Sequence, residues 1–187
     1  MSRPLPDAPF TLAEYLAIEP EGNVRHELID GELVAMTGTS RAHNAIAINL
    51  AAAIRPHLRG TPCRVASADM KVVIAELGRG YYPDLVVSCG DPSDEPDAYT
   101  ETRPRLIVEI LSPSTEAFDR GDKGDHYRSI PSLEDYVLVA QSTRAVEVRS
   151  RSGEGWTVTR RGAGDVVTLR SIGLELPVAT IYEDVAL

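Results

Sequence analysis

The chain has 187 residues, of which 43% are hydrophobic and 25% charged, and its formal net charge is −9. A chain of this length can bury a core without disulfides or a structural metal, so we expect a single domain over residues 1–187. No apolar run approaches the roughly 18 residues that a bilayer crossing needs. Residues 1–9 lack the basic-then-apolar order of a signal peptide, which predicts a cytoplasmic protein.

The two cysteines, Cys63 and Cys89, fit neither a zinc-ligand pattern nor a redox CxxC motif. In a reducing compartment we expect both to be free thiols in or near the core.

The negative net charge argues against a protein that coats nucleic acid, because such binding relies on clustered Lys and Arg. It does not exclude a nuclease, since an acidic metal site binds phosphate through its ion. Two interpretations remain open for four arginines: they form a local basic patch, or they are scattered surface charges. These are Arg41, Arg55, Arg59 and Arg64.

Local signals in the first third of the chain predict a helix, a hairpin and a second helix. A capping box at residues 11–14 opens a short helix to Ile18 or Glu19, which Pro20 and Gly22 end. Residues 25–36 alternate as a hairpin with its turn at Asp30-Gly31. A long helix follows from Ser40 as N-cap to residue 58, and its apolar stripe should pack on a sheet.

The pattern in the rest of the chain predicts strands and one more helix. Residues 64–75, 82–89 and 105–111 should be strands of one sheet covered by helix 40–58, with a polar loop at 90–104. A helix over 118–129 should stop near Pro131, and a meander of strands 135–140, 145–151 and 156–161 should follow, with a turn at 152–155. This order indicates an α/β (α+β) fold with a central mixed β-sheet flanked by helices.

Two isolated carboxylates interrupt the apolar strands: Asp84 in the second and Glu109 in the third. A buried ionised carboxylate costs several kcal/mol unless a cation or hydrogen-bond donors compensate it. If the two strands pair, both acids can project to one point and hold a metal ion. The alternative is that each acid lies half solvated at the sheet rim without a function.

These acids belong to a longer pattern. Pro83-Asp84 followed by Glu109 in a later strand looks like the PD-(D/E)xK nuclease motif, and the wider chain resembles the Uma-two family of bacterial restriction-endonuclease-like proteins. The segments that carry this resemblance, in order, are 25–33, His43, 82–84, 108–115, 119–123, 136–139 and 173–176. The resemblance implies a restriction-endonuclease-like fold.

The chain departs from the nuclease motif at Leu111, where the standard strand has a lysine that stabilises developing charge. Lys123 can replace it, because Asp119, Lys123 and Tyr127 recur on one face of the predicted helix. The alternative is an exposed helix lysine that pairs only with Asp119.

The resemblance implies metal-assisted hydrolysis of DNA. Asp84, Glu109 and the backbone carbonyl of Ile110 would bind Mg²⁺ or Mn²⁺, since these ions prefer oxygen ligands. Glu27 matches an additional acid of the wider nuclease fold, and many such nucleases act as homodimers. Further candidates at the edge of the site are Asp69, His43 and Gln141.

Two rival functions remain open. The first is a catalytically inactive nuclease-fold module that binds nucleic acid or protein, which the missing strand lysine favours. The second is a metal-dependent hydrolase of small phosphoesters, which suits a negatively charged protein.

Overall fold

The structure, a computed structural model, describes residues 9–19, 24–36, 38–91, 93 and 95–187. The predicted helix stop at Pro20 and Gly22 and most of segment 1–9 lie outside these residues. No helix in the described ranges is long and apolar enough to cross a membrane.

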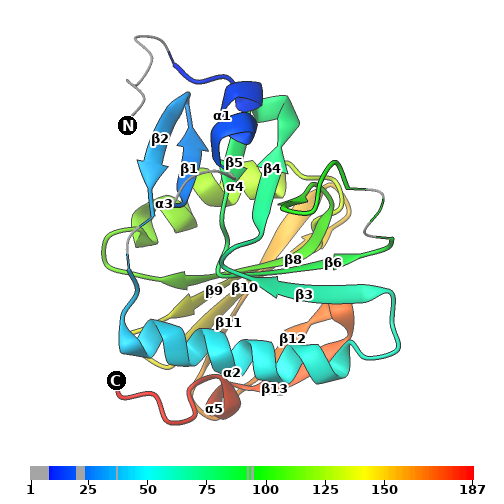
Figure 1. Cartoon of the computed structure of the whole chain (residues 1–187). Coiled ribbons are helices and arrows are strands. Elements are labelled where there is room, and N and C mark those ends of the chain that lie inside the picture. The colour runs from blue at the N-terminus through cyan, green and yellow to red at the C-terminus, as the bar shows by residue number, and fades with distance from the viewer. Residues whose placement is uncertain (1–8, 20–23, 37, 92, 94) are drawn as a thin grey trace.

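A six-stranded mixed sheet forms the centre of the molecule (Figure 1). Its strand order is β11-β10-β9-β8-β6-β3, in which β8 and β9 are parallel and the other neighbours antiparallel. Its strands are β3 (Cys63–Ser67), β6 (Leu85–Cys89), β8 (Pro104–Leu111), β9 (Asp135–Ala140), β10 (Ala145–Ser152) and β11 (Gly155–Gly162). The predicted central mixed sheet and meander are therefore confirmed.

A second, five-stranded sheet has the order β2-β1-β5-β4-β7, and a two-stranded sheet pairs β12 with β13. The five strands are β1 (His26–Ile29), β2 (Glu32–Ala35), β4 (Lys71–Ile74), β5 (Arg79–Tyr81) and β7 (Thr100–Glu101). The small sheet consists of β12 (Val166–Leu169) and β13 (Leu174–Pro177). The hairpin prediction is confirmed, because Asp30 and Gly31, with φ of 52° and 81°, form the turn between β1 and β2.

The prediction of one strand over 64–75 is wrong. Ser67 accepts backbone hydrogen bonds from Asp69 and Met70 in a turn, which separates β3 in the central sheet from β4 in the five-stranded sheet. The loop predicted at 90–104 contains β7, which pairs with β4.

Two hydrophobic clusters bury both faces of the central sheet. On one face, Ile46, Leu50 and Ile54 of α2 (Arg41–His57) pack against β6 and β8, as the apolar stripe predicted. Figure 1 shows α2, the small sheet and α5 (Val178–Ile181) on this side. The opposite face packs against β4, β5 and two short helices, α3 (Glu116–Arg120) and α4 (Asp122–Arg128). Burial on both faces explains why β8 is a nearly continuous apolar run.

Local capping signals are confirmed at both early helices. The Thr11 hydroxyl accepts from the Glu14 amide while the Glu14 carboxylate accepts from the Thr11 amide, which completes the capping box of α1 (Leu12–Ile18). Ser40 caps α2 by accepting from the His43 amide.

The interpretation of the cysteines as free thiols is wrong in this structure. Cys63 and Cys89 face each other at the end of the β3–β6 ladder and form a disulfide. Neighbouring strands bring together two residues whose sequence spacing contains no signal of pairing.

Candidate active site

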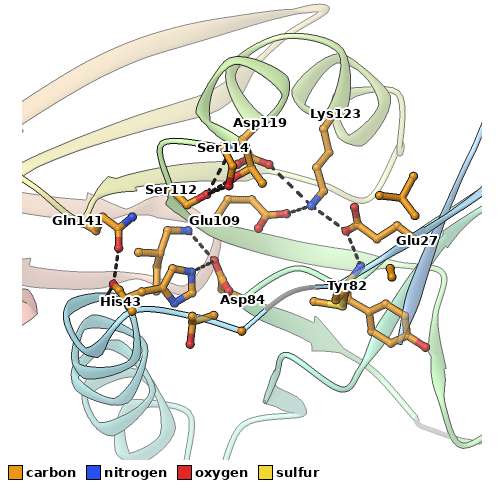
Figure 2. Close-up of a pocket in the computed structure, with 18 residues that line it drawn as sticks. Glu27, His43, Tyr82, Asp84, Glu109, Ser112, Ser114, Asp119, Lys123 and Gln141 are labelled. Atoms are coloured by element: carbon orange, nitrogen blue, oxygen red, sulfur yellow. Dashed lines mark hydrogen bonds and ion pairs between the residues drawn. The ribbon is translucent and has the colours of Figure 1, made fainter. Parts of the chain in front are cut away.

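A pocket of about 210 Å³ opens between the β1–β2 hairpin, the start of α2 and the α3–α4 segment. Figure 2 shows side chains from all of these elements pointing into it. Its polar lining consists of Glu27, Thr39, Ser40, His43, Tyr82, Asp84, Glu109, Ser112, Ser114, Thr115, Asp119, Lys123 and Gln141.

Asp84 and Glu109 reach this pocket from neighbouring strands. In the antiparallel β6–β8 pair Leu85 lies opposite Val108, so one further step places Asp84 opposite Glu109. Glu109 shares its face with Ile107 and Leu111, as its strand position predicts. With only 4% of its surface exposed, Glu109 is not a solvated residue at the sheet rim.

Two groups hold the Asp84 carboxylate. Its Oδ2 accepts a hydrogen bond of 2.7 Å from the Ile110 amide, and His43 Nε2 lies 3.2 Å from the same oxygen. His43, a candidate from sequence, therefore lies inside the site and contacts one of the two central acids.

Lys123 points into the carboxylate cluster (Figure 2). Its Nζ lies 2.9 Å from Glu27 Oε1, 2.9 Å from Glu109 Oε1 and 3.7 Å from Asp119 Oδ1. Lys123 is only 5% exposed, so the alternative of an exposed helix lysine is wrong. The Tyr127 hydroxyl donates to the same Glu109 oxygen at 3.1 Å.

The segment that carries Lys123 differs from its prediction. The single helix expected over 118–129 is broken at Gly121 into α3 and α4. A Cβ on Gly124 would lie 2.9 Å from the Asp119 carbonyl oxygen and 3.0 Å from Tyr136 Cε1. Glycine at this position therefore permits α4 to pack closely on β9, which directs Lys123 at the two strand acids.

Burial and mutual repulsion shift the pKa values in the cluster. Burial raises the pKa of Glu109 well above its ordinary value, opposed by Lys123 and reinforced by Asp119, Asp84 and Glu27. Burial likewise raises the pKa of Asp119. For Lys123, burial alone would lower the pKa, but the surrounding carboxylates outweigh it and raise the pKa. The expected raised carboxyl pKa is therefore present.

The donor chemistry of the pocket fits a divalent cation. Four carboxylates line it beside one lysine, which leaves a surplus of negative charge. Lys123 contacts Oε1 of both Glu27 and Glu109. The Ile110 amide and His43 contact Oδ2 of Asp84. However, no three His, Cys, Asp or Glu side chains among the described residues are arranged to hold a metal ion. Binding would therefore need a backbone carbonyl such as that of Ile110 and water molecules.

A chain of hydroxyl groups forms the wall beside Asp119. Ser112 Oγ lies 3.0 Å from Ser114 Oγ and 2.9 Å from Thr115 Oγ1, and accepts from the Thr115 amide. A hydrogen bond from the Thr115 hydroxyl partly opposes the rise in the pKa of Asp119 that burial causes. If Thr115 donates to Asp119, Ser112 donates to Thr115, and Ser114 in turn donates to Ser112.

The remaining candidates from sequence separate into two groups. Glu27 lines the pocket from β1 and accepts from the Tyr82 amide at 3.1 Å. Gln141 also lines it, and its Oε1 accepts from Ser40 Oγ at 2.5 Å. Asp69 does not line it: its side chain is 85% exposed, and it pairs with Arg25. The expectation of Asp69 near the site is therefore wrong, because the turn after β3 directs it to solvent.

Sequence reasoning did not identify Asp119 or the three hydroxyl residues as parts of the site. The signals were present, since Ser112, Ser114 and Thr115 directly follow the Glu109 strand and Asp119 lies one helical turn before Lys123. Another signal is composition: lysine occurs only at positions 71 and 123, and both are buried.

The fold is that of a nuclease-like protein. A crystal structure from Anabaena variabilis ATCC 29413, described as "a putative nuclease belonging to DUF820", aligns with a TM-score of 0.75. The alignment covers 93% of this chain and 98% of that chain, at 19% sequence identity. The predicted restriction-endonuclease-like fold is thereby confirmed.

The profile of the Uma2 family, described as "Putative restriction endonuclease", matches residues 12–179, and the chain belongs to this family. Two relatives come from Synechocystis sp. "Uncharacterized protein slr1290" is 37% identical over 185 residues, with 97% of each chain covered. "Uncharacterized protein sll1609" is 33% identical over 152 residues, which cover 80% of this chain and 86% of that protein.

Proposed function

We propose that this protein is a metal-dependent nuclease that hydrolyses DNA phosphodiester bonds. The observation that carries the proposal is the position of Lys123, 2.9 Å from both Glu109 and Glu27 in a pocket that also receives Asp84. A lysine from α4 thus lies beside the acid whose own strand has Leu111 in place of the usual lysine. Membership of the Uma2 family and the nuclease-like fold support the same function.

Asp84, Glu109 and the Ile110 carbonyl would hold Mg²⁺ or Mn²⁺. When bound, such an ion supplies Lewis-acid activation of a phosphodiester and of a water molecule. Lys123 places a fixed positive charge where negative charge develops on the phosphate. Glu27 and Asp119 keep the Lys123 ammonium in place, and His43 holds the orientation of Asp84.

Calorimetric titration with Mn²⁺ tests the metal site directly. We expect the wild type to bind Mn²⁺ and Asp84→Ala to lose this binding while keeping its fold. Asp69→Ala is the matched control, because it removes a carboxylate that is 85% exposed and outside the pocket. Absence of Mn²⁺ binding, or equal affinity in Asp84→Ala, would refute the shared site and favour the inactive binding module.

Cleavage assays with Mg²⁺ or Mn²⁺ then define the substrate. We expect cleavage of plasmid and oligonucleotide DNA. The net charge of −9 favours one competing substrate class, small phosphoesters. Hydrolysis of nucleotides without cleavage of plasmid or oligonucleotides would select that class. A homodimer stays a prediction, which sedimentation of the metal-loaded protein tests.

A further inference from the structure

One part of this acidic chain carries positive charge and no negative charge. Residues 33–68 contain four arginines and no Asp or Glu, although the whole chain carries a net charge of −9. Most of this segment is α2, which begins at the candidate active site, where Ser40 and His43 line the pocket. The arrangement raises the question of what the positive charge on α2 binds.

Three of these arginines are exposed along α2 and the turn that follows it. With 3.6 residues per turn, Arg55 lies about 40° around the helix axis from Arg41, and both lie on the side opposite the buried Ile46, Leu50 and Ile54. Arg59 lies in the turn directly after the helix. We call Arg41, Arg55 and Arg59 the arginine track.

The charges of the arginine track are not neutralised within the described residues, where none of the three guanidinium groups forms an ion pair. Arg64 differs, because its Nη2 donates to both Glu101 carboxylate oxygens at 3.0 Å. At the far end of α2, Arg55 and Arg59 line a groove of about 410 Å³ together with Leu58 and Cys63. The track therefore ends in a concave surface that carries two unpaired cations.

We propose that the arginine track binds backbone phosphates of a nucleic acid whose scissile phosphate lies in the candidate active site. This inference rests on the proposed function and adds a second contact to it. A helix rises 1.5 Å per residue, so Arg55 lies about 18 Å along α2 from His43, which corresponds to about five base pairs at 3.4 Å each.

Nucleic acid fits this surface better than an anionic membrane does. A helix that binds a membrane surface needs an apolar face to insert, but the apolar face of α2 is buried in the core. Between the arginines only Ile48, 58% exposed, offers a large apolar side chain. A row of separated guanidinium groups instead matches the regularly spaced phosphates of a strand.

Salt-dependent binding tests the track without requiring catalysis. The affinity for a fluorescein-labelled 20-base-pair duplex would be measured by anisotropy, in EDTA, at several NaCl concentrations. Each phosphate contact contributes about 0.9 to the slope of log affinity against log salt. The triple variant Arg41→Gln, Arg55→Gln, Arg59→Gln should therefore lower the magnitude of the slope by about 2.7. Circular dichroism should show an unchanged fold, because all three residues are exposed.

A single pair of variants provides the matched control. Arg55→Gln and Arg160→Gln change the net charge equally, but Arg160 lies on β11, is 78% exposed and pairs with Glu147. We expect Arg55→Gln to lower the magnitude of the slope by about 0.9 and Arg160→Gln to leave it unchanged. Equal slope changes in Arg55→Gln and Arg160→Gln would mean that only the net charge matters for binding, which would overturn the inference.

The outcomes separate the track from the proposed function. If the wild type binds DNA with the expected slope change but cleaves none with Mn²⁺, the track stands and the proposed function fails. If the wild type cleaves DNA and the triple variant binds it with the same slope, the track fails and the function stands. Binding to phosphatidylglycerol vesicles with no binding to DNA would also overturn the inference.

Discussion

The Lys123 ammonium lies 2.9 Å from the carboxylate of Glu109, and the two residues come from different elements, α4 and β8. Both are almost completely buried, so the Glu109 charge depends on Lys123, while Glu27 and Asp119 also stabilise the Lys123 charge. Removing one member of such a buried pair typically costs about 3–5 kcal/mol, because the remaining charge is left unpaired. Lys123 therefore links the stability of the α3–α4 segment to the chemistry of the pocket.

Gly124 should be essential for this placement. Gly124→Ala puts a Cβ against the Asp119 carbonyl oxygen and the Tyr136 ring, so we expect a loss of about 1–3 kcal/mol in the free energy of unfolding. Urea unfolding measures the loss. Gly155→Ala is the control, since its added Cβ meets no described atom closer than 3.9 Å. Equal stability of Gly124→Ala and wild type would contradict the close packing of α4 on β9.

The raised pKa of Glu109 predicts a pH-dependent stability. The folded state holds the Glu109 proton to higher pH than the unfolded chain, so this residue lowers the free energy of unfolding as pH rises above its ordinary pKa of 4.5. Glu109→Gln removes this dependence. In EDTA, the free energy of unfolding of Glu109→Gln minus that of wild type should be lowest at about pH 4 and should increase toward about pH 8.

Chemical unfolding of both proteins across this pH range measures the difference. Lys123, whose pKa is raised, stays protonated throughout and adds no pH dependence of its own. A difference that stays constant with pH would mean that Glu109 titrates normally.

The disulfide should stabilise the sheet edge. The bridge between Cys63 and Cys89 spans 26 positions, for which the chain-entropy relation gives about 3.5 kcal/mol. Dithiothreitol should therefore lower the urea midpoint of the wild type and leave that of the double variant Cys63→Ala, Cys89→Ala unchanged. The same midpoint with and without reductant would show that the bridge adds no stability.

Local features of the fold were predictable because their causes lie within a few residues. The capping residues Thr11 and Ser40 and the Asp30-Gly31 turn satisfy or redirect backbone groups beside them, whatever the rest of the chain does. The isolated positions of Asp84 and Glu109 in apolar strands similarly indicated a shared pocket before any pairing was known.

Features that depend on distant contacts were predicted incorrectly or not at all. The apolar pattern continues across Ala68, so it does not reveal that the chain moves from one sheet to another at this turn. Just before the break at Gly121, the Asp119 carbonyl accepts a hydrogen bond from Tyr136 on β9, a contact between residues 17 positions apart. The disulfide depends on the register of β3 with β6. The position of Lys123 was predictable because Leu111 occupies the place of the usual lysine, so another lysine had to supply its charge. The helix that carries Lys123 was predicted incorrectly, as one unbroken helix.

The most direct test of the account is Mn²⁺-dependent DNA cleavage by Lys123→Ala compared with wild type, with Mn²⁺ affinity measured on the same samples. We expect Lys123→Ala to lower kcat by about 10²-fold or more, with Mn²⁺ affinity little changed, because one charge-stabilising group is lost. Circular dichroism would confirm that the variant is folded. A folded Lys123→Ala variant that cleaves DNA at the wild-type rate would contradict the catalytic role of the lysine.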